Sequence, residues 1–443
     1  MILNKNKREQ MGFFSSFEDL LNHRHPLFIL GNTINWDQFE IAFSPLYSNE
    51  GRPAKAIRLM VGLLILKHIR NISDESVVEQ WAENAYYQYL CGETSFRPSE
   101  PCAASDLVHF RNRIGLAGME LIFKESIRIN GDDGKEEKIK IDTTVQEKNI
   151  TFPTDAKLHK KVIKKCKAIA DKEALPVRQT YTRILKQLGM DQRFRNHPKN
   201  KGKARKADKK VKTIAGRLVR ELERNLNAPG KYQNNLNIFN KILLQKRTDK
   251  NKIYSLHEPH VNCISKGKDH KKYEFGNKVS ISVTENTGVI VGAMSFSNNP
   301  YDGHTLPAVL DQYKTIFGKS PKEATVDRGY RGKTQIGETK INIPKPFNDK
   351  TLSKYQQTKL RKQFKRRAAI EPVIGHLKSD HRLSRNFYTG IKGDEINILL
   401  AAAAFNFKRM MNKWRKSIFD FIQNSIQNCN FVFKILFFNL KIS

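Results

Sequence analysis

The sequence contains no apolar run long enough to cross a membrane. Its two most apolar stretches, residues 396–405 and 431–440, are each about ten residues long, roughly half of what a membrane-spanning helix requires. The N-terminal residues include lysines but no long apolar segment before a small-residue cleavage site, so we expect no secretory signal. These absences predict a soluble, cytoplasmic protein without a membrane partner.

Cysteine is also scarce. Five cysteines are spread over 443 residues with no CxxC pair, which argues against a disulfide framework and is typical of reduced cytoplasmic thiols. A group of possible zinc ligands consists of His257, His260, Cys263 and His270. Their spacing fits no standard zinc finger, so we expect no zinc site there.

Acidic residues are few relative to basic ones. The chain has 44 Asp and Glu against 79 Lys and Arg, a formal net charge of +35. A field of that sign favours a large polyanion, of which nucleic acid is the commonest and an anionic membrane surface the second. The length allows two or three domains with a large core.

Most of the excess charge lies in one segment. Residues 157–250 carry 28 Lys and Arg against 7 Asp and Glu, a net charge of +21. Their apolar residues recur at helical spacing, which predicts packed helices rather than a disordered tail. Such a unit suits phosphate binding, with Lys206, Lys209 and Lys210 as candidate contacts, and the alternative is a solvated helical hairpin.

Residues 1–130 read as a small helical domain. Apolar residues recur at helical spacing over 57–68, Ser73 caps a second helix, and a third helix near residues 105–115 carries Arg111 and Arg113. Helices joined by short turns predict either a helix-turn-helix, in which these arginines contact DNA, or a bundle used for packing or dimerisation. Both readings stay open at this point.

After a linker at residues 131–137 the pattern changes from helical to alternating. Residues 138–144 predict a strand that ends near Asp142, and residues 278–296 predict a β-hairpin. A helix over 305–318 leads to a short strand, 323–327, that ends in Asp327. An acid at the end of a strand serves either chemistry or a turn, and for a single Asp the turn is the commoner role.

Two further stretches carry charge in a distinctive setting. Residues 328–332 form a glycine-flanked loop in which Arg328 and Arg331 can approach a phosphate backbone. Residues 364–378 place Glu371 on one helical face with Phe364, Arg367 and Lys378, provided that Pro372 does not break the helix. Taken alone, this second stretch reads as a solvated basic helix with an internal salt bridge. Beyond it, Asp394 opens a predicted apolar helix that runs into a basic end near Lys416.

Asp142, Asp327 and Glu371 together suggest a metal site. Carboxylates from neighbouring strands and a helix can hold two divalent ions, and their hard oxygen ligands suit Mg²⁺, with Mn²⁺ as a possible substitute. Such a site activates a hydroxyl nucleophile for phosphoryl transfer.

In these features the chain resembles bacterial insertion-sequence transposases of the DDE class, in particular the insertion-sequence-five branch of the four/five superfamily. The resemblance covers residues 30–410, and it depends on Asp142 followed by two threonines, on the segment 326–332, and on the spacing Arg367-x3-Glu371-x6-Lys378. The signature normally begins with a Tyr three residues before the Arg, where this chain has Phe364.

The resemblance implies an α/β fold: an RNase H-like catalytic domain with a mixed five-stranded sheet over residues 138–416, interrupted by the basic helical insertion at 157–250. A separate all-α domain at 1–130 would recognise terminal inverted repeats, and the tail at 417–443 stays unassigned. Asp142, Asp327 and Glu371 would be the catalytic metal ligands, and Arg367 and Lys378 would hold DNA phosphates. We expect Phe364 to weaken one DNA contact.

The implied activity is hydrolysis of phosphodiester bonds at the element's ends, followed by joining of the 3′-hydroxyl ends to target DNA. The partner is double-stranded DNA, with at least a homodimer on paired ends, in the cytoplasm and associated with the nucleoid. Two alternatives are an RNase H-like nuclease without strand transfer and an inactive DNA-binding relic.

Overall fold

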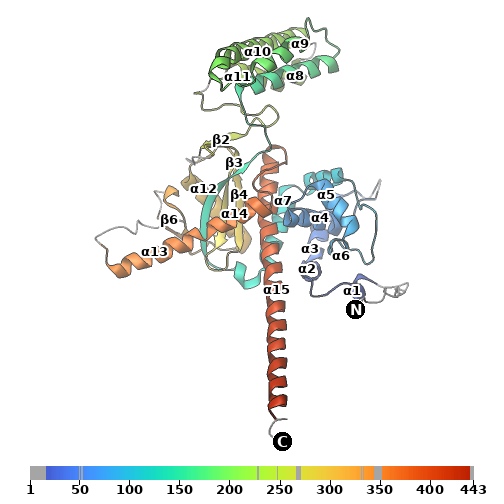
Figure 1. Ribbon diagram of the computed structural model, residues 1–443, viewed down its shortest axis with the longest axis vertical. Coiled ribbons are helices and arrows are strands. Elements are labelled where there is room, and N and C mark those ends of the chain that lie inside the picture. Colours follow the sequence, from blue (N-terminus) through green and yellow to red (C-terminus); the bar gives the residue numbers. More distant parts are fainter. Residues whose placement is uncertain are drawn as a thin grey trace.

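The computed structural model describes residues 16–439 except 49, 51, 52, 227, 228, 247, 266–270, 331, 333 and 344–351. Within that range it does not describe the side chains of residues 229, 360, 363, 364 and 418–439. Figure 1 shows a central sheet, a group of helices beside it, a helical unit at the top and one long C-terminal helix.

The N-terminal part is entirely helical in the residues described. Its α-helices are α1 (Phe17–Leu20), α2 (Pro26–Thr33), α3 (Trp36–Phe43), α4 (Ile57–Arg70), α5 (Asp74–Glu83), α6 (Ala85–Leu90) and α7 (Ala104–Ile129). Ser73 caps α5 as predicted, with its hydroxyl 3.1 Å from the N–H of Ser76. Gly115, at φ 58°, kinks α7 at the predicted boundary between two helices.

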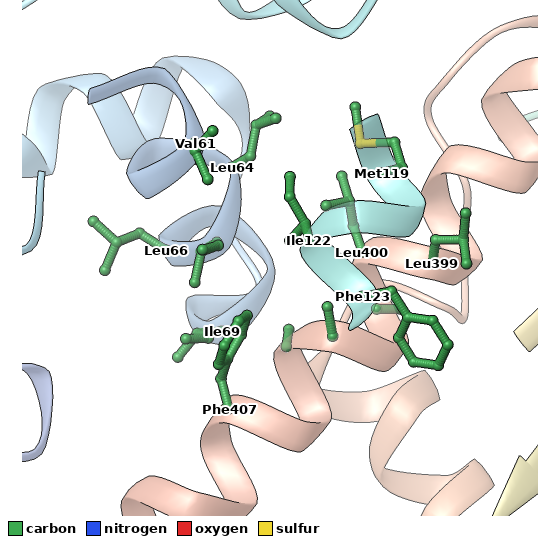
Figure 2. Close-up of a cluster of buried hydrophobic side chains, with 14 of the residues drawn as sticks. Val61, Leu64, Leu66, Ile69, Met119, Ile122, Phe123, Leu399, Leu400 and Phe407 are labelled. Carbon is green, nitrogen blue, oxygen red and sulfur yellow. The ribbon is translucent and has the colours of Figure 1, made fainter. Parts of the chain in front are cut away.

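These helices share one hydrophobic core with the C-terminal helix α15 (Gly390–Asn439). Figure 2 shows α4, α7 and α15 meeting around a set of apolar side chains. The labelled residues are Val61, Leu64, Leu66, Ile69, Met119, Ile122, Phe123, Leu399, Leu400 and Phe407. The all-α region is thus distinct along the chain, but in space it packs onto the part that follows.

The described residues form a sheet of seven strands in the order β2-β3-β1-β5-β7-β6, with β4 paired to β3. The strands are β1 (Lys138–Glu147), β2 (Asn262–Ser265), β3 (Tyr273–Thr284), β4 (Ile290–Phe296), β5 (Glu323–Thr325), β6 (Gln335–Ile336) and β7 (Thr339–Asn342). The predicted hairpin is the antiparallel pair β3 and β4. Five strands, β4-β3-β1-β5-β7, form the expected mixed sheet, and the short β2 and β6 extend it beyond the predicted number.

Each face of the sheet is covered by helices. Ile139 and Ile141 of β1 pack with Leu306 and Tyr313 of α12 (Asp302–Phe317). On the opposite face, residues of β3 and β4 belong to the core that contains α7, α14 (Ile370–Asp380) and α15. The helix predicted from residue 305 therefore begins three residues earlier, at Asp302.

The basic insertion folds as a helical unit with a hydrophobic core of its own, as predicted. Its α-helices are α8 (Asp155–Lys172), α9 (Thr182–Asp191), α10 (Pro198–Asn225) and α11 (Gln233–Leu244). In Figure 1 this unit lies beyond the β2 end of the sheet, away from the N-terminal helices. Ala204, Ala207 and Val211 face its core, so the intervening lysines of α10 face outward.

The stretch with Glu371 is divided between two helices, α13 (Lys354–Ala368) and α14, which meet at Ala369. Pro372 is the third residue of α14, where a missing backbone N–H costs little, because the first turn of a helix leaves its N–H groups without partners. The helix predicted to open at Asp394 begins earlier, at Gly390, and continues to Asn439 through residues for which the sequence predicted no structure. Among the described helices, none is long and apolar enough to cross a membrane.

A buried ion pair joins α15 to the end of β1. Lys148 Nζ lies 2.6 Å from Asp394 Oδ1, and the two side chains are 2% and 1% exposed. Asp394 also accepts hydrogen bonds from Asn277 and Asn386, and Glu258 lies 3.8 Å from the same lysine. Asp394, first read as a helix-opening residue, is thus the centre of a polar network that fixes α15 against the sheet.

We predict that Asp394→Ala destabilises the protein by about 3–5 kcal/mol, because it leaves a buried lysine without its main partner. The measurement is the free energy of unfolding in urea. Asp132→Ala is the matched control, since Asp132 forms an exposed ion pair with Lys135 and should leave the urea midpoint unchanged. Equal midpoints for the two variants would contradict the role given to Asp394.

Candidate active site

Asp142 lies in the middle of the sheet, on the strand between β3 and β5. Its side chain is half-buried, and its Oδ1 accepts a hydrogen bond of 2.8 Å from the N–H of Thr143. The apolar neighbours Ile139 and Ile141 point to the α12 side, so the alternation of the strand sends Asp142 to the other face. Along β1, the strand is buried before and after Asp142, and this burial keeps the strand in place.

Asp327 follows β5, which runs parallel to β1. The register pairs Lys140 with Thr325, so Asp142 and Asp327 each lie two residues beyond a paired position. Since adjacent strands are about 4.8 Å apart, the two carboxylates come to the same level of the sheet. The prediction of a strand that ends near Asp142 is wrong, because β1 continues to Glu147 and Asp142 lies within it. Asp327 Oδ1 accepts a hydrogen bond of 2.7 Å from the N–H of Gly329.

Glu371 comes from the first turn of α14, which packs against β1 through its buried side. Ile370, Val373 and Leu377 form that side, and the Glu371 side chain is 62% exposed. Helix α14 thereby brings a third carboxylate, which is exposed, close to the two aspartates.

The Arg367 guanidinium lies among all three carboxylates. Its Nη2 is 3.4 Å from Asp142 Oδ2 and 4.0 Å from Asp327 Oδ2, and its Nη1 is 3.9 Å from Glu371 Oε1. Its side chain is 14% exposed, and its Nε is buried without a hydrogen-bond partner. The salt-bridge reading of this stretch therefore needs correction: the arginine is shared with two acids from the sheet.

This arrangement fits a divalent cation by its chemistry. The three carboxylates offer hard oxygen ligands, and a positive group already stands between them. As they stand, no three His, Cys, Asp or Glu side chains in the described part of the chain are grouped closely enough to hold a metal ion. Arg367 thus acts as the counter-ion of the acidic cluster in this structure.

A buried tyrosine lies behind the cluster. Tyr330 is 1% exposed, and its hydroxyl has no hydrogen-bond partner. Burial raises the pKa of Tyr330 far above its usual value, and the negative charges of Asp142, Asp302 and Asp327 raise this pKa further. The hydroxyl therefore stays protonated beside the acids.

Sequence reasoning missed Asp302, a fourth carboxylate at the same place. It lies in the first turn of α12, accepts a hydrogen bond of 2.9 Å from the Thr143 hydroxyl and forms an ion pair of 2.8 Å with Lys278. An acid that opens a helix is common, so its local sequence carries no sign of this position. The position of Asp302 near the site becomes visible only in its hydrogen bond with Thr143, the residue next to Asp142.

The residues expected to contact DNA fall into three groups. Arg328 is exposed directly beside Asp327, and Lys378 is half-buried on α14, two turns after Glu371. Arg331 lies outside the described residues, as does the Phe364 side chain on α13. The α10 lysines 206, 209 and 210 are exposed.

The Arg111 side chain is buried, whereas a contact with DNA requires an exposed one. Its side chain is 6% exposed, and both of its terminal nitrogens lie 2.8 Å from the Asp74 carboxylate. The guanidinium also stacks 4.6 Å from the Tyr388 ring centroid. Arg111 therefore ties α5 and α7 to the chain before α15, and the expectation of a groove contact fails. Arg113 is exposed and stacks over Tyr47 at 4.2 Å.

The histidines considered as possible zinc ligands have polar neighbours in the described part of the chain. His260 Nε2 lies 3.2 Å from Glu258 and 3.4 Å from Asp394, within the polar network of α15. His257 Nδ1 lies 2.9 Å from the Ser255 hydroxyl, and His270 lies outside the described residues.

Carboxylates that meet from two neighbouring strand segments and a covering helix are the arrangement expected of metal-dependent phosphoryl-transfer proteins. Two families match the chain. A transposase domain matches residues 15–113, and the transposase DDE domain matches residues 255–407. The second match includes Asp327 and Glu371 but begins after Asp142, which the β1–β5 pairing brings to them.

The uncharacterized protein ORF8 in nfe locus, from Rhizobium meliloti, is 39% identical over 190 residues. That similarity covers 42% of this chain and 92% of the relative. No solved structure matches the chain. The chain belongs to the DDE transposases of insertion sequences, enzymes that cut and join DNA, and its sheet has the RNase H-like fold of their catalytic domain. This family typically uses divalent metal ions.

We predict that Arg367→Met increases the affinity of the DNA-free protein for Mn²⁺ about tenfold. The guanidinium competes with a metal for the same carboxylates, and a difference of 1.4 kcal/mol corresponds to that factor. The measurement is a titration of free Mn²⁺ by electron paramagnetic resonance. Arg366→Met, an exposed neighbour, is the control and should change nothing. An unchanged or weaker affinity for Arg367→Met would contradict the counter-ion role.

Proposed function

We propose that this transposase belongs to the insertion-sequence-five branch and that Asp142, Asp327 and Glu371 hold two Mg²⁺ ions. It would bind the terminal inverted repeats, hydrolyse the phosphodiester bond at each end of the element, and join the freed 3′-hydroxyl to target DNA. The observation that carries the proposal is the convergence of these three acids on Arg367 from two parallel strands and a helix.

Bound metal would lower the pKa of the attacking water or hydroxyl and offset the charge that develops on the leaving oxygen. The protein's own groups have separate tasks. Asp142 and Asp327 each have one oxygen held by a backbone N–H, so the other oxygen is directed toward the centre of the site. Tyr330 closes the inner wall, since its ring is buried behind the acids.

Cations placed around the acids would hold the DNA. Arg367, once released from the carboxylates, and Arg328 lie at or next to the acidic cluster, where the scissile phosphate must come, and Lys378 follows two turns along α14. Farther away, the basic helices of residues 157–250 would bind the DNA flanking the cleavage site, and the N-terminal helices would take part in recognising the repeats. Two ends held together imply at least a homodimer, acting on chromosomal DNA in the cytoplasm.

The first test uses a duplex that carries the inverted repeats flanking the gene, with Mg²⁺ and a supercoiled target plasmid. We expect the wild-type chain to nick the ends and form joined products, and Asp327→Asn to lose activity at least 1,000-fold, because one wall of the metal site is gone. Asp311→Asn, an exposed acid on α12, is the matched control.

Three results would overturn the proposal in different ways. Equal activity of Asp327→Asn and wild type removes Asp327 from the site. Cleavage of duplexes without repeats and without joined products indicates a nuclease, and repeat binding without metal-dependent cleavage indicates a relic.

The second test concerns the insertion. Lys206, Lys209 and Lys210 share one exposed face of α10, since residues three and four apart are neighbours on a helix. We predict that replacing all three with Ala weakens DNA binding and lowers the slope of log affinity against log salt by about one unit per lost phosphate contact. Replacing the exposed Lys135, Lys314 and Lys319 is the charge-matched control. Equal slopes for both triple variants would exclude the α10 face.

A further inference from the structure

We propose that Asp302 is a positioning residue for the catalytic acids and, through them, for divalent metal binding. This inference depends on the proposed function, because it concerns the same carboxylates. Asp302 lies on α12, outside the three-acid motif, yet it contacts the segments that carry two of those acids.

The first contact leads to Asp142. Asp302 Oδ1 accepts a hydrogen bond of 2.9 Å from the Thr143 hydroxyl, and the N–H of the same Thr143 donates to Asp142 Oδ1 at 2.8 Å. Asp142 Oδ2 remains for the centre of the site, where it lies 3.4 Å from Arg367. Fixing Thr143 therefore fixes which oxygen of Asp142 faces the centre.

The second contact leads to Asp327. A carbon added at Gly329 would lie 3.4 Å from Asp302 Oδ2 and 2.9 Å from Asp327 Oδ1, so both carboxylates lie near the space that a side chain at this position would occupy. The N–H of Gly329 donates to Asp327 Oδ1 at 2.7 Å. Asp302 thus accepts a hydrogen bond from Thr143 and lies near Gly329, the two residues whose backbone N–H groups orient the catalytic aspartates.

The charge of Asp302 is used in an ion pair with Lys278. Lys278 lies 2.8 Å from Asp302 Oδ1 and also donates to the carbonyl of Pro300, which anchors the carboxylate to β3. Because the Thr143 hydroxyl and Lys278 both contact Oδ1, a carboxamide at position 302 would keep an oxygen for them but lose the charge that binds Lys278, which loosens the anchor of the side chain.

Residues that orient metal ligands commonly change metal affinity or activity by 10–100-fold when they are replaced. We expect Asp302→Asn to weaken Mn²⁺ binding by about that factor in the full-length, DNA-free protein, measured by electron paramagnetic resonance of free Mn²⁺. In the cleavage assay kcat should fall while KM for DNA stays unchanged, and a higher Mn²⁺ concentration should restore part of the rate. Asp311→Asn, on the same helix, should behave as wild type.

Thr143→Val provides a second variant that keeps the ion pair between Asp302 and Lys278. It should weaken Mn²⁺ binding in the same direction, and the double variant should be no worse than Asp302→Asn alone, because both act along one path. This variant decides the question if Asp302→Asn fails to fold.

The outcomes separate this inference from the proposed function. If Asp327→Asn loses Mn²⁺ binding while Asp302→Asn and Thr143→Val bind like wild type, Asp302 has only a structural role and the inference is wrong. If wild type and Asp327→Asn bind Mn²⁺ alike, the proposed metal site itself fails, and the role of Asp302 with it.

Discussion

The parallel pairing of β1 with β5 is the constraint on which the site depends. Asp142 and Asp327 are 185 positions apart in the chain, and only this register brings them to the same level. A shift of one residue would turn one carboxylate to the opposite face, because successive side chains on a strand alternate. The apolar residues on both strands therefore do more than build a core, since they also set the alignment of the two acids.

The long helix α15 makes that alignment rigid. It packs against the sheet on one side and against α2, α4 and α7 on the other, so the N-terminal helices and the sheet share a single core. Arg111, Lys67 and Asp74 add an ion-pair cluster under the Tyr388 ring, close to the start of α15. Movement of the N-terminal helices against the sheet would have to break this core, so the DNA-end recognition assigned to them starts from a fixed orientation.

Much of the fold follows from the sequence because it is encoded locally. The strands could be predicted from the alternation around Ile139 and Ile141 and from the turn before Val289. The helices of the basic segment could be predicted from its apolar spacing. The three acids could be joined only by resemblance to a family, since no local pattern encodes a parallel pairing between distant strands. Arg111 was misjudged because a helical pattern does not reveal a partner such as Asp74, which lies 37 residues earlier.

Other features depend on tertiary contacts in the same way. Asp302 looks like an ordinary acid at a helix start, and its importance comes from Thr143 and Gly329, which are distant in sequence. Asp394 looked like a helix cap but is buried with Lys148. The boundary at Ala369 lies before Pro372, so the proline does not kink a continuous helix; it is accommodated in the first turn of a new one.

The position of Arg367 has a thermodynamic consequence. In a site that works as proposed, one guanidinium serves two anions in succession, first the carboxylates and then a phosphate. Binding free energies of this kind are reciprocal: whatever factor the metal adds to the affinity for DNA, DNA adds to the affinity for the metal. Each ligand alone would then bind more weakly than it does in the presence of the other.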